Sequence, residues 1–278
     1  MRTVLITGTS AGFGLVTAVE LAKRGWRVIA SMRNLDRRGP LDAALIAAGA
    51  APNVDIIQLD VNDANSIAQG VEAMLAVTGG TLDAVVHNAG VAAGGAFEDI
   101  PEAELRRVME TNFFGVMTLT RALLPTFRKQ RAGRIVIVSS ESAFHGQPGN
   151  SIYVASKWAV EGWAESLAYD VEQFGIKVLL IEPGPYVTDI YLASDAAVRA
   201  VGQRLPAMER EPVPGGRCAC GQERSWSAGG RDQDRRRSGG EEPILPQPGA
   251  PRCAFHAFCA GQSSQPLDAQ VCRDLSWP

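Results

Sequence analysis

Tyr153 and Lys157, in the segment Tyr-Val-Ala-Ser-Lys, are the residues of this chain whose types and spacing most clearly suggest chemistry. Positions four apart share one face of a helix, so the lysine ammonium can lie beside the phenol. A free phenol, with a pKa near 10, is a poor acid or base at neutral pH. One cation about 4 Å away, at an effective dielectric of about 20, supplies roughly the 4 kcal/mol that lowers this pKa by about three units. The pair therefore indicates a tuned proton donor and acceptor, although chance also places Tyr and Lys together on solvated helix faces.

A glycine-rich segment near the N-terminus is a second candidate. Residues Thr7 to Gly14 read Thr-Gly-Thr-Ser-Ala-Gly-Phe-Gly, between an apolar run and a helical pattern. Glycines let the backbone turn tightly and approach a pyrophosphate, whose charge the N-terminus of a helix stabilises. A plain strand-to-helix turn is the alternative. The order of strand, loop and helix favours a dinucleotide site.

The elements that must position these residues alternate between strand and helix patterns. The predicted strands are Arg2–Thr7, Arg27–Ser31, Val54–Leu59, Leu82–His87, Arg134–Ser139 and Lys177–Ile181. The predicted helices are Ala11–Arg24, Leu41–Ala48, Ala64–Val77, Glu102–Arg131 and Ile152–Phe174. This alternation predicts an α/β fold of the Rossmann type, a doubly wound parallel sheet with ligands at the carboxyl ends of its strands.

Composition narrows the classes of function. The chain has 278 residues, a net charge of -3 and 46% hydrophobic residues, which is ordinary for a globular protein and gives no hint of nucleic acid. The first apolar run is too short for a signal peptide, and no stretch is long enough to span a membrane. We therefore expect a cytoplasmic protein without a membrane span.

The chain changes character near residue 210. Residues 211–278 hold 9 Gly, 8 Pro, 8 Arg and no Lys, with only 8 residues of Ile, Leu, Val or Phe. Such segments rarely build a packed core. We expect residues 1–210 to form one catalytic domain and residues 211–278 a tail of low order. The tail is either a genuine disordered extension or a C-terminus replaced by translation in a shifted reading frame.

All five cysteines fall in this tail, at Cys218, Cys220, Cys253, Cys259 and Cys272. The cysteine-free body argues against a disulfide framework. Cys218 and Cys220 lack the C-x2-C spacing and the second ligand pair of a zinc site, so no metal is expected. Arg235 to Arg237 could form a basic patch for nucleic acid, but acidic residues surround it, which favours a solvated run.

Six separated motifs together resemble the short-chain dehydrogenase/reductase family. They are the glycine loop, Asn88-Ala89-Gly90, Asn112, Ser140, Tyr153-x-x-x-Lys157 and Pro183-Gly184, and the resemblance covers about residues 1–205. Thr-Gly-Thr-Ser, Ser-Met-Arg-Asn and Pro-Gly-Pro-Tyr-x-Thr are similar to the branch of 17β-hydroxysteroid and retinol dehydrogenases. The resemblance implies hydride transfer between a nicotinamide cofactor and a small-molecule alcohol or carbonyl substrate, here an apolar one.

The resemblance also implies a role for each catalytic residue. Tyr153 would exchange a proton with the substrate oxygen, and Lys157 would lower the pKa of Tyr153 and hold the nicotinamide ribose. Ser140 would hydrogen-bond the same oxygen, with Ser139 as the fallback. Asn112 would interrupt the long helix and hold a water that relays protons to Lys157.

Cofactor contacts follow in the same way. The implied set is Gly8, Thr9, Ser10, Gly12, Phe13, Gly14, Arg33, Asp60, Val61, Asn88, Ala89, Gly90, Tyr153, Lys157, Pro183, Gly184, Tyr186 and Thr188. Asp60 and Val61 would meet the adenine, although Asp60 could instead be an acid at a helix N-terminus. Thr188 would bond the carboxamide, with the backbone near Tyr186 along the ring.

The end of the second predicted strand favours NADP over NAD. An acid there would bind a ribose 2′-hydroxyl, whereas this chain has Arg33 and no acid before Asp36. A guanidinium matches phosphate geometry well, although Arg33 could be a plain surface arginine. Ala11 departs from the serine that related NADP enzymes often carry.

Several expectations rest on the surrounding residues. His145 and Gln147 could line a substrate pocket or a solvated loop, and Trp158 and Trp163 are expected to pack. The helices Glu102–Arg131 and Ile152–Phe174 are the implied interface of a homodimer or homotetramer. A non-catalytic dinucleotide-binding protein and a catalytically impaired protein with an altered pocket wall remain the alternatives.

Overall fold

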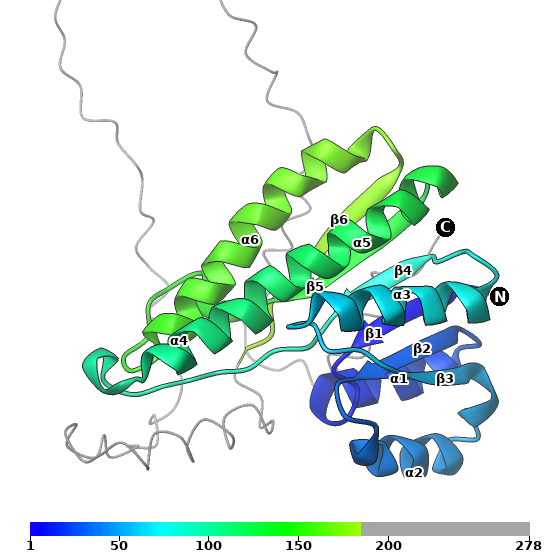
Figure 1. Ribbon diagram of the computed structural model, residues 1–278, viewed down its shortest axis with the longest axis horizontal. Helices are drawn as coiled ribbons and strands as arrows, with labels where there is room; N and C mark the ends of the chain where they lie inside the picture. Colours follow the sequence, from blue (N-terminus) through cyan, green and yellow to red (C-terminus); the bar gives the residue numbers. More distant parts are fainter. Residues whose placement is uncertain (185–278) are drawn as a thin grey trace, which may run out of the picture. The chain divides into compact units, whose positions relative to one another are not determined.

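A computed structural model describes residues 1–184, and a parallel sheet of six strands forms its centre (Figure 1). The strands are β1 (Thr3–Thr7), β2 (Arg27–Met32), β3 (Val54–Gln58), β4 (Ala84–His87), β5 (Gly133–Val138) and β6 (Ile176–Ile181). Their order is β3-β2-β1-β4-β5-β6, and all neighbours are parallel. The predicted doubly wound α/β fold is confirmed.

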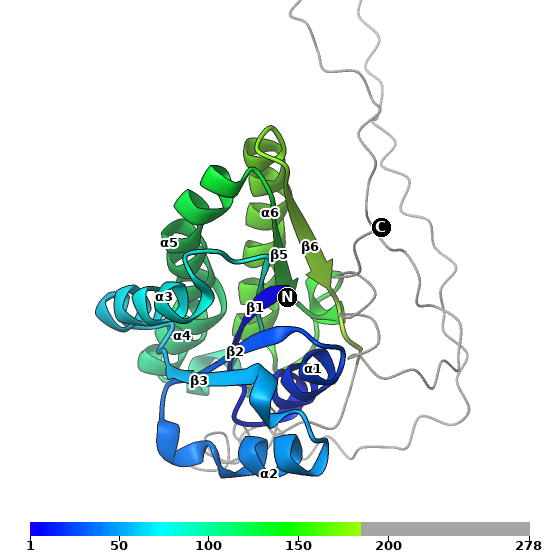
Figure 2. The ribbon, with the colours of Figure 1, turned by 90° about the vertical axis from the view of Figure 1, so that its right-hand side faces the viewer.

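Helices cover both faces of the sheet. On one face lie α1 (Gly12–Lys23) and α2 (Gly39–Ala47), and on the other lie α3 (Ala64–Thr78), α5 (Gly115–Gln130) and α6 (Ser151–Glu172) (Figure 2). α4 (Glu102–Met109) leads into α5. Short 3-10 helices in the connections are Leu35–Arg37, Ala51–Asn53, Phe97–Asp99 and Glu141–Ala143.

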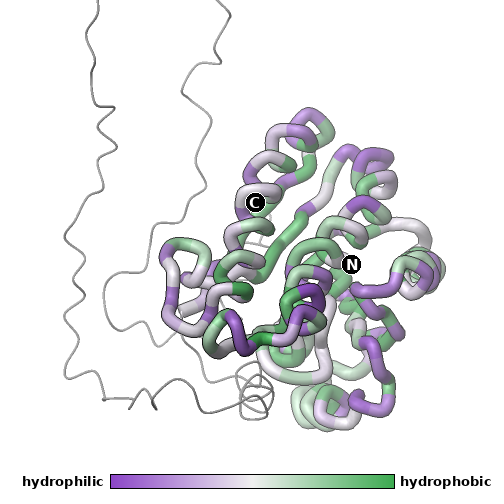
Figure 3. The backbone as a smooth tube through the Cα atoms, turned by 60° about the vertical axis from the view of Figure 1, so that its left-hand side comes forward, coloured by the Kyte–Doolittle hydropathy of each residue, from purple (hydrophilic) through white to green (hydrophobic). Residues whose placement is uncertain are grey.

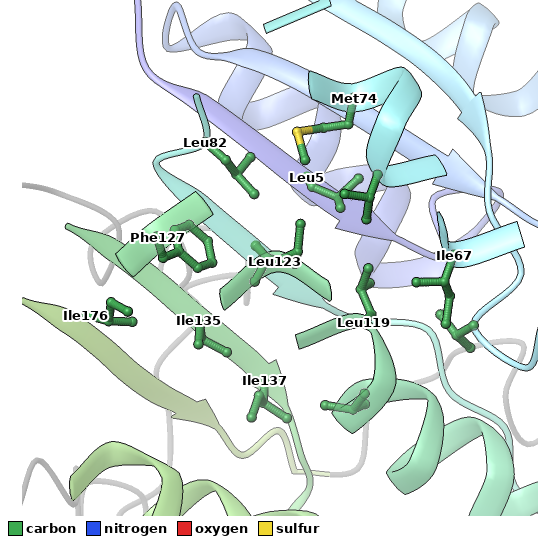
Figure 4. Packing of buried hydrophobic residues seen from close by; sticks show 14 of the residues in the cluster. Leu5, Ile67, Met74, Leu82, Leu119, Leu123, Phe127, Ile135, Ile137 and Ile176 are labelled. Carbon is green, nitrogen blue, oxygen red and sulfur yellow. The ribbon is translucent and has the colours of Figure 1, made fainter. Parts of the chain in front are cut away.

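The central strands of the sheet are buried on both faces because helices pack on each, whereas the edge strands β3 and β6 are partly exposed. All five residues of β1 are buried. Leu5 packs with Leu119, Leu123 and Phe127 of α5, and Figure 4 shows these side chains converging between sheet and helices. Fully burying one such side chain stabilises the fold by about 1.5–3 kcal/mol. Figure 3 accordingly shows mainly green strands in the middle, with purple gathered on the surrounding helices and loops.

The long helix predicted over Glu102–Arg131 is not continuous. A π-helical segment, Glu110–Phe114, separates α4 from α5. Asn112 lies in this segment and makes paired hydrogen bonds with the backbone of Val91, donating from Nδ2 at 2.8 Å and accepting at Oδ1 at 2.9 Å. The interruption attributed to Asn112 thus takes the form of a local π turn, a feature that often marks functional sites.

The positions of β1 and β4 explain where a ligand can bind. After β1 the chain adds β2 and β3 on one side, and it then places β4 on the other side of β1. At such a switch point the connecting segments leave in opposite directions and open a crevice at the carboxyl ends of the strands. Gly8 follows β1 and Asn88 follows β4, so both predicted site residues lie at this crevice.

Some element boundaries differ from those predicted, and some predictions concern residues that the structure does not describe. α2 begins at Gly39 rather than Leu41, because Pro40 is accepted in a first helical turn. None of the helices within residues 1–184 is long and apolar enough to cross a membrane. The end of the predicted domain, the tail, the cysteines, Tyr186 and Thr188 lie outside the described residues.

Candidate active site

The glycine segment turns directly from β1 into α1. Gly8 has a φ of +71° and Gly12 a φ of +57°, left-handed values that favour glycine. A Cβ added at Gly14 would lie 2.3 Å from the carbonyl oxygen of Gly8 and 2.4 Å from Nδ2 of Asn88. Ala11, at the start of the helix, makes no capping bond with its side chain. The first N–H groups of α1 therefore suit an anionic ligand.

Asn88 joins this loop to the end of β4. Its Nδ2 donates to the carbonyl oxygens of Thr7 at 2.9 Å and of Gly8 at 3.0 Å. The Thr7 hydroxyl oxygen accepts from the backbone N–H groups of Asn88 and of the next residue, each at 3.0 Å. On the other side, Thr9 donates from its backbone N and its Oγ1 to the carbonyl oxygen of Ser31, each at 3.1 Å. The loop is therefore held between β2 and β4.

A cavity of about 380 Å³ lies at the carboxyl ends of the strands, lined by residues that follow each strand from β1 to β6. The predicted site residues that line it are Gly8, Ser10, Gly12, Phe13, Arg33, Asp60, Val61, Asn88, Ala89, Gly90, Ser140, Tyr153, Lys157, Pro183 and Gly184. Thr9, Gly14 and Asn112 do not line it but support the loops that do. One cavity thus joins the glycine loop to the Tyr-Lys pair.

Two arginines lie at the end of the cavity near β2. Arg33 directly follows β2, and the 3-10 helix Leu35–Arg37 brings Arg37 to the same wall. Asn34 caps this short helix, with Oδ1 accepting from the backbone N–H of Asp36 at 2.8 Å. The Asp36 side chain does not line the cavity. This wall is therefore positively charged, and sequence reasoning identified only the first of its two arginines.

Asp60 lines the cavity wall that follows β3. Its Oδ1 accepts from the backbone N–H of Asn62 at 3.0 Å. The helix α3 is capped instead by Asp63, whose Oδ1 accepts from the backbone N–H groups of Asn65 at 2.8 Å and Ser66 at 3.3 Å. The capping role considered for Asp60 therefore belongs to Asp63.

Tyr153 and Lys157 project from the first turns of α6 into the cavity. The Lys157 Nζ lies 5.6 Å from the centroid of the Tyr153 ring and donates to the carbonyl oxygen of Val138 at 2.9 Å. Both side chains are buried. Burial lowers the pKa of Lys157 to about 8, against the opposing influence of the Glu161 carboxylate. The ammonium is thus held close to the phenol ring in a site shielded from water.

Ser140 is buried at the end of β5 and lines the cavity. Its Oγ accepts from the backbone N–H of Ser142 at 3.1 Å, so the hydroxyl hydrogen can serve a substrate oxygen. Ser142 is fixed in turn, since its Oγ donates to Oε1 of Gln147 at 3.1 Å and its carbonyl oxygen accepts from Nε1 of Trp158 at 3.1 Å. Gln147 and His145 do not line the cavity, so Gln147 braces this loop instead.

The neighbouring Ser139 has a different partner. Its Oγ donates a hydrogen bond to Oε1 of Glu161, on the turn of α6 after Lys157. Burial raises the pKa of Glu161 to about 7, a shift that the Ser139 hydrogen bond opposes and that Glu182 and Glu165 reinforce. Sequence reasoning missed Glu161, although its spacing of four residues from Lys157 was a usable signal.

Asn112 connects three parts of the site. Besides its bonds to Val91, its Nδ2 lies 3.0 Å from Oγ of Ser156 on α6, and the Ser156 hydroxyl donates to the carbonyl oxygen of Tyr153 at 2.7 Å. The amide therefore links the loop after β4 to the helix that carries the Tyr-Lys pair. Arg107 and Thr111 also line the cavity near this π segment, and the sequence patterns did not single them out.

Comparison with known proteins identifies the class that this fold and site define. Residues 2–198 match the family model of short chain dehydrogenases. The chain therefore belongs to the short-chain dehydrogenase family, as its motifs predict.

Individual relatives agree with this placement. Retinol dehydrogenase 8 of Bos taurus is 43% identical over 193 residues, which cover 68% of this chain and 60% of the relative. The 17-beta-hydroxysteroid dehydrogenase type 1 of Homo sapiens is 38% identical over 189 residues, covering 66% of this chain and 57% of the relative. A metagenomic short-chain oxidoreductase, solved in complex with NADP, is 27% identical with a TM-score of 0.62, covering 73% of this chain and 91% of that one. The chain thus spans about 60% of the length of these two dehydrogenases.

Proposed function

We propose that this protein is an NADP-dependent oxidoreductase that transfers hydride between the nicotinamide and an alcohol or carbonyl carbon. The observation that carries the proposal is the Tyr153–Lys157 pair, which lines the same cavity as the glycine loop of a dinucleotide site. Each feature alone could be a surface pair or a plain turn. Their meeting in one cavity at the switch point of the sheet favours a reaction centre.

The residues present fit a dinucleotide. A side chain at Gly14 would collide with Gly8 and Asn88. Because glycine has none, the backbone of the loop and the start of α1 can accept a pyrophosphate. When bound, the nicotinamide would supply the hydride acceptor or donor. Asp60, Val61 and the residues from Asn88 to Gly90 would hold the adenosine half.

Proton transfer is assigned to residues of the chain itself. Tyr153 would give a proton to a carbonyl oxygen during reduction, or take one from a hydroxyl during oxidation. The Lys157 ammonium would stabilise the phenolate and hold a ribose hydroxyl, while Ser140 would donate a hydrogen bond to the substrate oxygen. Asn112 would position the end of the helix and a relaying water.

The choice of NADP follows from the charge at the end of β2. Arg33 and Arg37 both line this wall, and guanidinium groups match a 2′-phosphate. An acid at this place would instead repel the phosphate. The metagenomic relative was solved with NADP, which supports the same choice.

For the substrate we propose an apolar alcohol or ketone. The support is the similarity to a retinol dehydrogenase and a 17-beta-hydroxysteroid dehydrogenase. The predicted segment through Tyr186 and Thr188, which would cover the nicotinamide, lies outside the described residues. A cytoplasmic homodimer or homotetramer is also proposed, with the exposed Phe114, Trp158 and Tyr169 near the interface implied by the family.

Ligand-dependent melting followed by turnover tests this proposal. We expect NADPH at about 100 times its Kd to stabilise the protein by about 2.7 kcal/mol, and an equal concentration of NADH to stabilise it less. Reduction of a hydrophobic ketone would then be followed by NADPH absorbance. Stabilisation without turnover of a panel of carbonyls would favour the non-catalytic binding protein, and the absence of a cooperative melt would favour the impaired one. Equal stabilisation by NADH would contradict the choice of NADP.

A further inference from the structure

Glu161 lies next to the proposed reaction centre, but the proposed reaction gives it no role. Tyr153, Lys157 and Glu161 follow one another at intervals of four residues, so they share one side of α6. That side meets the end of β5, where the Val138 carbonyl oxygen accepts from Lys157 and the Ser139 hydroxyl donates to Glu161. The carboxyl is therefore part of the contact that joins α6 to the Ser140 turn.

The charges around Glu161 come from two places. Two carboxyls raise the pKa of Glu161: Glu165, on the next turn of α6, and Glu182, just after β6. The nearby cation, Lys157, lowers it. Burial is the main cause that raises the pKa of Glu161, to about 7. This group therefore changes charge near neutral pH, whereas an exposed carboxylate is already ionised there.

Lys157 depends on such a partner because it is buried. Taking an ammonium out of water favours its neutral form. Among residues 1–184, Glu161 is the carboxyl whose charge favours the ammonium form, and it acts without a direct ion pair. Loss of the negative charge would also lower the pKa of any other acid nearby, the Tyr153 phenol included.

We propose that Glu161 is a positioning residue of the oxidoreductase reaction, keeping the buried Lys157 charged and, through Ser139, holding the turn that presents Ser140. The inference rests on the proposed function. Protonation of Glu161 removes the counter-charge of Lys157 and replaces an anionic acceptor of Ser139 by a neutral one. Turnover thus responds to the ionisation of a carboxyl that touches neither substrate nor cofactor.

The test compares Glu161→Gln with Glu165→Gln. Glutamine keeps the size of the side chain and an oxygen that can accept from Ser139, but it has no charge. For Glu161→Gln we expect the upper apparent pKa in the pH profile of kcat for carbonyl reduction, which belongs to the coupled Tyr153–Lys157 pair, to fall by about 0.5 to 1 unit. Glu165→Gln removes the same charge one turn further from Lys157. It lowers the pKa of Glu161, but Glu161 is already ionised at the pH of the upper limb, so the upper apparent pKa should stay within about 0.2 units of the wild-type value.

Equal shifts in the two variants would indicate a general effect of net charge and would overturn the proposal. So would a profile of Glu161→Gln that coincides with that of the wild type. Because a variant could lose activity for other reasons, a second measurement uses the protein without cofactor. An acid with a raised pKa in the folded state binds a proton on folding, so its contribution to stability is lost as pH rises between about 4.5 and 7.

We therefore expect the Tm of the wild type, relative to that of Glu161→Gln, to fall as the pH rises through this window. A difference in Tm that is independent of pH would overturn this inference alone. A wild-type protein that binds NADPH but turns over no carbonyl would overturn the proposed function, and this inference with it. The two failures are thus distinguishable.

Discussion

The contact between α6 and the end of β5 determines the burial and the hydrogen bonding of individual residues of the site. Tyr153 and Lys157 are both buried, and the lysine finds a backbone carbonyl at 2.9 Å rather than a direct carboxylate partner. The positive charge of an ammonium acts more strongly on nearby groups when no anion lies beside it to cancel part of that charge. The arrangement places the Lys157 ammonium beside the Tyr153 ring without a direct salt bridge.

Replacement of the phenol tests this at the residue scale. Tyr153→Phe keeps the buried ring and removes only the hydroxyl. Because the proposed general acid is lost, we expect kcat for carbonyl reduction to fall about 10²- to 10⁴-fold. The NADPH-induced rise in Tm should persist, since the glycine loop and the arginine wall are unchanged. Initial rates and melting curves with and without NADPH provide the two measurements.

The matched control for this variant is Tyr169→Phe. Tyr169 lies on the same helix and is 71% exposed, so loss of its hydroxyl should leave both rate and cofactor response unchanged. A Tyr153→Phe protein that retains more than about a tenth of the wild-type rate would rule out Tyr153 as the main proton donor.

At the scale of the element, the proposed cofactor site depends most clearly on α1. Gly14 is one of its first residues, and there the helix comes so close to the backbone of Gly8 that no side chain fits. The close approach directs the start of α1 toward the cavity. The glycine therefore affects ligand binding by setting the position and the direction of the whole helix α1.

A pair of Gly→Ala variants tests this statement. In Gly14→Ala the new methyl group would lie 2.3 Å from a backbone oxygen, so we expect a loss of stability of about 1–3 kcal/mol and at least tenfold weaker NADPH binding. Gly162→Ala, inside α6, meets nothing within 4 Å and should stabilise the protein by up to about 1 kcal/mol. Urea unfolding and NADPH titration measure both quantities, and equal behaviour of the two variants would contradict the packing argument.

The elements differ in how well their sequence predicts them. The strands and the glycine loop could be predicted because apolar runs and glycine positions are local signals. The π segment could not, since Asn112 adopts it to reach the backbone of Val91, a residue on another loop. The contact of Ser139 with Glu161 joins residues 22 apart on different elements. The spacing of Glu161 from Lys157 indicates a shared helix face, but it does not indicate the partner at the end of β5. Arg37 was missed because a 3-10 turn imposes no clear spacing on an exposed arginine.

At the scale of the molecule, His87 makes stability depend on pH. It is buried at the end of β4, where Nε2 lies 2.9 Å from Oγ1 of Thr120 and Nδ1 has no partner among the described residues. Burial lowers the pKa of His87 from 6.5 to about 3. The unfolded chain therefore binds a proton between these values that the folded protein excludes.

We accordingly expect His87 to reduce the free energy of unfolding by about 1.4 kcal/mol for each pH unit below about 6.5, until the folded histidine itself takes up a proton. Because Glu161 is expected to contribute in the opposite direction between about pH 4.5 and 7, the prediction concerns differences between proteins. The free energy of unfolding of the wild type relative to that of His87→Leu should fall as the pH is lowered, whereas the exposed His145→Asn should keep the pH dependence of the wild type. Urea unfolding from pH 4 to 7 measures the slopes. A difference between the wild type and His87→Leu that does not change with pH would contradict the assignment to His87.

The pairing of β1 with β4 also has a consequence for the order in which the chain assembles. β1 pairs locally with β2, but it meets β4 only after some 80 residues, where Val4 lies opposite Ala84. Closing a loop of that length is entropically costly, and non-local pairing is slow. We expect the unit from β1 to β3 to form early and β4 to join it late. On that route, the crevice proposed to hold the cofactor forms only when the two halves of the sheet meet.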